Sequence, residues 1–197
     1  MHAIDRVVRV RILTEYARAG ASHKGWYEET TKHLREFSRN SGYPIEQVAA
    51  VFSILSPRVR VSTNYNLLRK YFFHKSKGHE SPSEMMEVMR STRSALYHWE
   101  RTGAIRGPKT SAFCRALLGD PNAVVLDLWM ARALGVEQST LSRKKVYDTN
   151  AALVASVADI LQMTPAQAQA AIWFGVSKSW HSNPFTAKQE QTCLDLW

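Results

Sequence analysis

The fold of this chain is decided by residues 103–134, which read GAIRGPKTSAFCRALLGDPNAVVLDLWMARAL. The stretch opens with a short Gly-containing hairpin, residues 103–109, which ends at Lys109, and an apolar-periodic helix follows. A Gly-Asp-Pro-Asn segment then breaks that helix, and a second apolar run places Asp127 at the start of another helix. The pattern therefore predicts helix, loop and helix, with Lys109 and Asp127 as the two residues most suited to chemistry.

On both sides of this stretch, the apolar pattern predicts a succession of helices and no convincing strand. The apolar run of residues 124–126 is too short for its period to decide, and we interpret it as a buried approach to a helix. The segment 45–55 is apolar nearly all round, which predicts a central, buried helix. The other predicted helices lie at 4–19, 25–41, 61–75, 83–89, 92–101, 142–161 and from Pro165 onward. We expect an all-α fold of about ten helices in a single domain over residues 1–197, with two helical lobes around a central cleft and the terminal helices packed together.

Composition restricts the partners and the compartment. The net charge of +9 and the isoelectric point of about 9.8 favour a polyanion partner, most often nucleic acid, although a basic surface that is merely solvated is the alternative. Cys114 and Cys193 form no CxxC pair and the histidines have no ligand spacing, so we expect no metal and no cofactor. No stretch has transmembrane length and charged residues interrupt the first apolar run, which predicts a cytoplasmic protein that does not bind membranes; we expect a monomer.

The turn at 103–107 is suited to binding phosphate. A turn between two helices can present backbone N–H groups at the start of the second helix, where the helix dipole favours negative charge. Arg106 and Lys109 add full positive charges at that place. The turn is thus a candidate for a DNA contact that does not depend on sequence, and an ordinary corner between helices is the alternative.

This region resembles the helix-hairpin-helix DNA glycosylase superfamily, the enzymes similar to endonuclease III and alkyladenine glycosylase. In that family a hairpin of the form LPGVGRKTA leads into a helix, and a loop with Gly and Pro precedes an apolar-Asp pair. The step from Lys109 to Asp127 has the length found in endonuclease III-type members. The resemblance covers roughly residues 25–175. The chain also resembles uncharacterised phage and bacterial members of this fold. The segments that carry it are 107–111, 118–121, 125–127 and 54–58 with Asn64.

The resemblance implies an activity on double-stranded DNA. Asp127 would be the catalytic carboxylate that stabilises positive charge on the sugar while the N-glycosidic bond breaks. Water would attack the sugar, or the amine of Lys109 would attack instead and form a Schiff base that can lead to strand cleavage. The alternatives are that Asp127 is only a helix N-cap and that Lys109 only contacts phosphate.

Three departures from the family pattern are visible. Ile105 stands where the family has its first hairpin glycine, and Arg58 holds the position of the glutamine that wedges into DNA. The iron–sulfur cysteines of endonuclease III are absent. Arg58 is therefore the candidate wedge for base flipping.

The remaining site predictions concern the DNA face and the base pocket. The tryptophans and the tyrosine proposed for the pocket have core packing as their alternative. We predict the DNA face from Arg58, Arg60, Gly103, Arg106, Gly107 and Thr110, and the pocket walls from Trp26, Tyr27, Trp129 and Trp173.

The predicted function is excision of a damaged or modified base from DNA, which leaves an abasic site. The base is either a common oxidised or alkylated lesion or an enzymatically modified pyrimidine, such as a hydroxymethylated or glycosylated one in phage DNA. A biological role in DNA repair or in phage defence is open at this point. Two other functions stay open: a DNA-binding module without catalysis on the same fold, and an enzyme that acts on modified pyrimidines as free nucleosides.

Overall fold

The computed structural model describes residues 3–181, and over this range the protein contains helices and no strand. This confirms the all-α prediction. No helix in the described range is long and apolar enough to cross a membrane. The α-helices are α1 (Ala3–Ala19), α2 (Trp26–Ser41), α3 (Ile45–Leu55), α4 (Val61–Ser76), α5 (Arg90–Thr102), α6 (Pro108–Leu117), α7 (Leu128–Leu134), α8 (Lys144–Leu161) and α9 (Pro165–His181), and the 3-10 helices are η1 (Ala21–His23), η2 (Pro82–Met85) and η3 (Gln138–Ser142).

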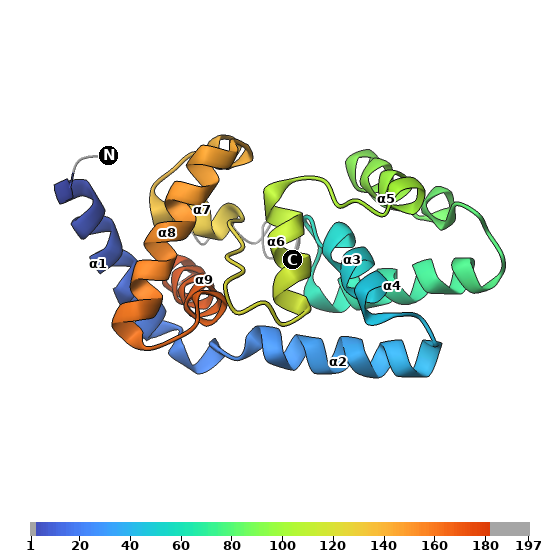
Figure 1. Cartoon of the computed structure of the whole chain (residues 1–197), viewed down its shortest axis with the longest axis horizontal. Coiled ribbons are helices and arrows are strands. Elements are labelled where there is room, and N and C mark those ends of the chain that lie inside the picture. Colours follow the sequence, from blue (N-terminus) through green and yellow to red (C-terminus); the bar gives the residue numbers. More distant parts are fainter. Residues whose placement is uncertain (1–2, 182–197) are drawn as a thin grey trace.

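The helices form two groups that do not follow chain order (Figure 1). In the first group α1 packs against α8 and α9, and α7 packs against α9. The second group consists of α3 to α6, in which α3 contacts α4, α5 and α6. Helix α2 runs along both groups and contacts α3, α6 and α9. The chain thus leaves the first group after α1, builds the second, and returns to the first at α7.

The α3 helix is the centre of the second group. Its residues from Val48 to Leu55 are all buried, because the segment is apolar on every side and other helices surround it. This confirms the prediction of a central helix at 45–55. The helix ends at Leu55. Ser56 still has helical backbone angles, with φ −64° and ψ −22°, and Pro57 then follows, which has no N–H to continue the helical hydrogen bonds.

Two glycines let α1 and α9 approach closely. A Cβ atom at Gly20 would lie 2.0 Å from the carbonyl oxygen of Ala171, and one at Gly175 would lie 1.9 Å from the carbonyl oxygen of Tyr16. Neither distance is possible for real atoms, so the backbones can meet at this separation only where side chains are absent. The contact fixes α9, the helix that brings Gln169 and Trp173 to the site described below.

Two predicted elements differ from the structure. The helix predicted at 83–89 is the 3-10 helix η2, and its Ser83 is bound by the Glu100 side chain from α5. The helix predicted at 142–161 begins at Lys144, because residues 138–142 form η3 instead. In the first case a contact from another helix, which local periodicity does not report, decides the conformation.

Candidate functional site

A cavity of about 220 Å³ lies where the two helix groups meet. Its lining residues come from α2, α3, α4, α6 and α9 and from the segment before α7. The wall is mostly apolar, and Ser56 and Val59 from the loop after α3 complete it. Its aromatic side chains are Trp26, Tyr27, Phe52, Phe113, Trp173 and Phe174. A planar, apolar ligand of modest size is what such a cavity is suited to bind.

Asp127 lies on the cavity wall and caps α7. Its residue is only 5% exposed, its Oδ1 accepts a hydrogen bond from the backbone N–H of Met130 at 3.0 Å, and its Oδ2 accepts one from Nε1 of Trp173 at 2.7 Å. The carboxylate is therefore fixed in orientation by both helices that frame it. The N-cap role that the sequence left as an alternative is present, and it coexists with a place on the cavity wall.

Lys109 lies on the same wall, in the first turn of α6, and is half-buried. Burial lowers its pKa, and the negative charge of Asp127 acts in the opposite direction. Burial likewise raises the pKa of Asp127, while Lys109 and the N–H donors around the carboxylate lower it. The structure thus brings the two residues that the sequence singled out close enough to influence each other's charge.

Tyr147 from α8 holds the segment that leads into Asp127. Its hydroxyl donates to the carbonyl oxygen of Val124 at 2.8 Å and accepts from the backbone N–H of Leu126 at 3.1 Å. Burial raises the pKa of this hydroxyl to about 12, so it stays protonated at neutral pH. This side chain therefore satisfies one carbonyl and one N–H group of the buried run 124–126 without a strand partner.

Opposite side chains of the cavity are also linked. The hydroxyl of Tyr27 donates to Oε1 of Gln169 at 2.5 Å, and both residues are buried. Burial, with a further contribution from the charge of Asp127, holds the pKa of Tyr27 well above its usual value. Trp26 packs nearly parallel to Phe113, with ring centroids 6.1 Å apart. These contacts orient the cavity walls before any ligand enters.

Of the four residues predicted for the pocket, three line the cavity: Trp26, Tyr27 and Trp173. Trp129 does not, and its prediction is corrected here. It is 2% exposed, and the guanidinium of Arg132 lies 4.5 Å from its ring centroid. A residue two positions after Asp127 points to a different side of α7, so its ring packs in the core instead.

The predicted DNA-binding residues lie on two segments. Arg58 and Arg60 are exposed on the loop between α3 and α4, and Val59 between them lines the cavity. Arg58 has a φ of 59°, a left-handed conformation that is uncommon for a residue with a side chain. The loop therefore presents positive charge beside the cavity.

The second segment is the turn between α5 and α6 together with the first residues of α6. Gly103, Arg106 and Gly107 are exposed and Thr110 is half-buried. Only the end of this segment, at Lys109, reaches the cavity. Gly103, together with Ile105, lines a separate hollow on the side of α5, so the turn is not a single surface towards the cavity.

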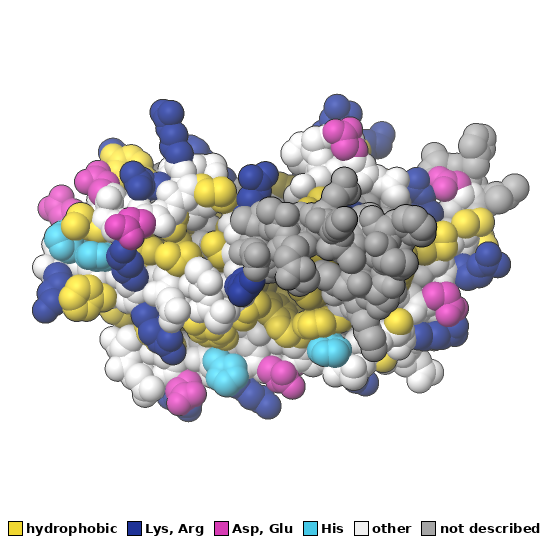
Figure 2. Space-filling view, turned by 180° about the vertical axis from the view of Figure 1, so that it is seen from behind, with side chains coloured by type: hydrophobic (Ala, Val, Ile, Leu, Met, Phe, Trp, Pro, Cys, Tyr) yellow, Lys and Arg dark blue, Asp and Glu magenta, His cyan; other side chains and the backbone are white. Residues whose placement is uncertain are grey.

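The basic excess is distributed over many elements. On the face seen in Figure 2, Lys and Arg side chains alternate with Asp and Glu side chains and with hydrophobic ones. Charge alone therefore does not define a DNA-binding surface on this face. The cationic residues next to the cavity are the ones with a structural reason to contact a ligand.

Several cavity residues were absent from the sequence-based prediction. Phe113 lies four positions after Lys109 on α6, and Gln169 lies four positions before Trp173 on α9. Residues four apart share a helix face, so this spacing was a usable signal once one member of each pair was suspected. Phe52 and Phe174 carried no such signal, because each stands among apolar neighbours that do not single it out.

Within residues 3–181 there is no group of three or more His, Cys, Asp or Glu side chains able to hold a metal ion. A comparison with curated proteins gave no match, and a comparison with solved structures gave none. One family model matches, and it covers residues 3–180, which includes every residue of the cavity. The chain belongs to this family of unknown function, DUF7178.

Proposed function

We propose that this protein is a DNA glycosylase that excises a damaged or modified base and leaves an abasic site, on a fold similar to the helix-hairpin-helix glycosylases. The observation that carries the proposal is the pairing of Asp127 and Lys109 on one wall of a small aromatic cavity. A base that has left the DNA stack needs a pocket with aromatic walls, and bond cleavage needs a carboxylate beside the sugar.

The chemistry follows from the placement of Asp127. As the bond between the base nitrogen and C1′ breaks, its electron pair leaves with the base and positive charge builds on the sugar. A carboxylate fixed by Met130 and Trp173 stabilises that charge without having to reorient. A water oxygen then bonds to C1′, and the departing base takes up a proton.

Lys109 supplies a second possible nucleophile. A lysine amine attacks carbon only when it is neutral, and burial lowers the pKa of this amine. Attack at C1′ would give a Schiff base with the opened sugar, from which strand cleavage can follow. The position of Lys109 at the start of α6, directly after the phosphate-binding turn, supports DNA contact in either case.

Arg58 and Arg60 support the same substrate. Both are exposed on the loop whose Val59 lines the cavity. A duplex lying over this loop would bring its phosphates to Arg60 and a flipped base to the cavity. Arg58 is the residue we propose to occupy the space that the base leaves.

One observation favours a second function, a DNA-binding module without catalysis. Both carboxylate oxygens of Asp127 already accept hydrogen bonds from the protein, as expected of a residue that only stabilises α7. In that case the cavity would bind a flipped base and release it unchanged.

The deciding experiment is incubation with genomic DNAs that carry different modifications, followed by mass spectrometry of the released bases. We expect wild type to release one class of base and Asp127→Asn to release none while it still binds DNA. Asn is also a good N-cap, so this variant keeps α7. If wild type releases no base from any DNA but binds duplexes, the DNA-binding module is the correct function. Release from free nucleosides and not from duplexes would instead identify a nucleoside-level enzyme.

A further inference from the structure

Asn64 is a polar residue of the cavity wall with an unused acceptor. It lies in the first turn of α4 and is 2% exposed. Its Nδ2 donates a hydrogen bond to the carbonyl oxygen of Phe52 at 3.0 Å. Its Oδ1 is buried, and no donor from the described part of the chain reaches it. A buried acceptor without a partner is rare in native proteins and calls for an explanation.

The contact with Phe52 fixes which end of the amide is which. If the amide were turned over, two acceptor oxygens would lie 3.0 Å apart, so the nitrogen must face the carbonyl. Oδ1 is then an acceptor held in a constant orientation. Asn64 lines the same cavity as Asp127, which makes a ligand donor the natural partner of this oxygen.

In Gln169 the other end of the side-chain amide is free, the donor and not the acceptor. Its Oε1 accepts from the Tyr27 hydroxyl, so its Nε2 is the end of the amide that remains to donate. Both residues line the cavity, so its wall contains one side chain with a free acceptor, Asn64, and one with a free donor, Gln169. Bases such as cytosine and adenine carry an amino donor beside a ring nitrogen that accepts, whereas their keto counterparts carry an oxygen beside a ring N–H.

We propose that Asn64 Oδ1 accepts a hydrogen bond from the exocyclic amino group of the base that enters the cavity, so that the protein selects amino-bearing bases over their keto counterparts. This inference rests on the glycosylase function proposed above. A keto oxygen in the same place would lie opposite Oδ1 in apolar surroundings. Both oxygens are acceptors, so neither would have a donor. Asn64 is thus a specificity-determining residue rather than a catalytic one.

The test uses duplexes with one unpaired probe base, supplied as matched amino and keto pairs. The pairs are cytosine and uracil, 5-hydroxymethylcytosine and 5-hydroxymethyluracil, and adenine and hypoxanthine. Selectivity is measured twice, as the rate of base release and as binding affinity. We expect wild type to favour the amino member of at least one pair by about 10- to 100-fold, the range for a buried polar group left unpaired.

The variant is Asn64→Leu, which has a similar shape and removes the acceptor together with the Nδ2 donor to the carbonyl oxygen of Phe52. We expect its amino-to-keto ratio to fall towards one. Asn150→Leu is the matched control, because Asn150 is a buried asparagine of α8 whose Nδ2 donates to the carbonyl oxygen of Val146 at 2.8 Å, and it does not line the cavity. It should keep the wild-type ratio. If Asn64→Leu does not fold, Asn64→Ala carries the same comparison.

The two readouts separate this inference from the proposed function. An amino preference in binding that disappears in Asn64→Leu, without base release by wild type, supports the role of Asn64 and refutes the glycosylase. Base release with no amino preference, or with the preference intact in Asn64→Leu, refutes the role of Asn64 and leaves the glycosylase standing. If wild type shows no base release and no amino preference, both the role of Asn64 and the glycosylase function are refuted.

Discussion

Two regions of this protein combine a carboxylate with a lysine and aromatic rings, and they use the combination differently. One is the cavity around Asp127; the other is a hollow around Glu100, on α5. Glu100 accepts from the hydroxyl of Tyr71 at 3.0 Å and from the backbone N–H and hydroxyl of Ser83 at 2.8 and 2.5 Å. These bonds tie α4, α5 and η2 together, so this carboxylate holds helices in place.

The lysine of the second region is also held by its surroundings. Lys75 donates to Oε1 of Gln47 at 2.9 Å, and its ammonium lies 5.5 and 5.8 Å from the ring centroids of Tyr43 and Trp99. Burial lowers its pKa, and the charge of Glu100 acts in the opposite direction.

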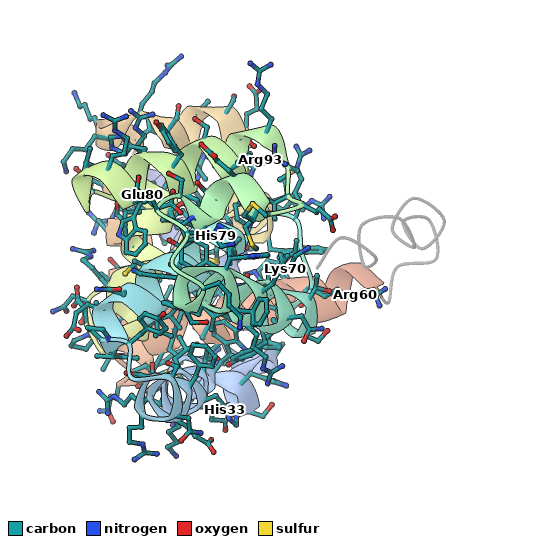
Figure 3. The ribbon with its side chains drawn as sticks, turned by 90° about the vertical axis from the view of Figure 1, so that its right-hand side faces the viewer. His33, Arg60, Lys70, His79, Glu80 and Arg93 are labelled. Atoms are coloured by element: carbon teal, nitrogen blue, oxygen red, sulfur yellow. The ribbon has the colours of Figure 1, made fainter. Side chains whose placement is uncertain are left out.

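The two regions also differ in shape and position. The hollow has a volume of about 520 Å³ and is wider than the Asp127 cavity. His79 and Glu80 line it, and Figure 3 shows them well apart from Arg60, which belongs to the loop beside the cavity. The same residue types therefore stabilise helix packing in an open hollow and provide a candidate reaction centre in a narrow apolar cavity. The more enclosed and more apolar wall of the Asp127 cavity makes the difference, because it determines how far the charged forms are desolvated.

The strongest test of the different roles of Asp127 and Glu100 is to neutralise each carboxylate in turn. We expect Asp127→Asn to lower the rate of base release by about 10²–10³-fold or more, because a preorganised charge beside the reacting sugar is lost. Glu100→Gln should leave the rate within a few fold of wild type. The measurement is single-turnover release on the duplex that wild type prefers. Equal losses in both variants would show that Asp127 acts only through the fold.

The same comparison applies to the two lysines. With borohydride present, wild type should form a covalent adduct with DNA that is visible by gel shift, since a neutral Lys109 amine can form a Schiff base. Lys109→Met should abolish the adduct, and Lys75→Met should retain it. No adduct with wild type would end the lyase proposal and leave water as the nucleophile.

For the free energy of unfolding we expect the reverse order, with a larger loss in Glu100→Gln than in Asp127→Asn. Glu100→Gln weakens three hydrogen bonds that join separate helices, and we expect it to lower the free energy of unfolding by about 1–3 kcal/mol. Asp127→Asn should cost less, because its Oδ1 can still cap α7 and only the hydrogen bond from Trp173 is lost, since the amide nitrogen cannot accept it. Urea denaturation followed by circular dichroism measures both. A larger loss in Asp127→Asn would place the main structural carboxylate at the cavity.

The pH dependence of base release tests the electrostatic interaction between Asp127 and Lys109. Burial raises the pKa of Asp127, so base release should increase with pH through a value above the usual carboxylate pKa of about 3.9. Lys109 lowers the pKa of Asp127, hence Lys109→Met should move this acid limb to higher pH. Lys75→Met should not move it. An acid limb that stays in place in Lys109→Met would mean that another group controls it.

The smallest effect concerns Arg58. Arg58→Gly should weaken DNA binding a few fold, because the side chain that fills the space left by the base is lost, and the removal of one cation should reduce the salt dependence of the binding constant by about one unit of slope. The same substitution should raise the free energy of unfolding by about 1 kcal/mol, because glycine adopts a φ of 59° without strain. Arg58→Ala is the control: it should share the binding loss and not gain stability.

Much of the fold was readable from local sequence. The all-α class, the boundaries of α3 and α4 to within a residue, and the buried character of α3 follow from apolar spacing and from proline and glycine at helix ends. The same reading placed Asp127 directly before α7 and Lys109 at the start of α6. These features depend on neighbours within one or two turns, so a single sequence is sufficient for them.

The tertiary structure alone decided which distant residues meet. Trp129 is as aromatic as Trp173, yet only Trp173 lines the cavity and binds Asp127, because helix phase and packing set the direction of each ring. The Glu100 bonds to Ser83 and Tyr71, and the close approach at Gly20 and Gly175, join residues from separate segments. Periodicity reports which face of a helix is apolar, and it does not report which other helix covers that face; that is settled by packing over the whole chain.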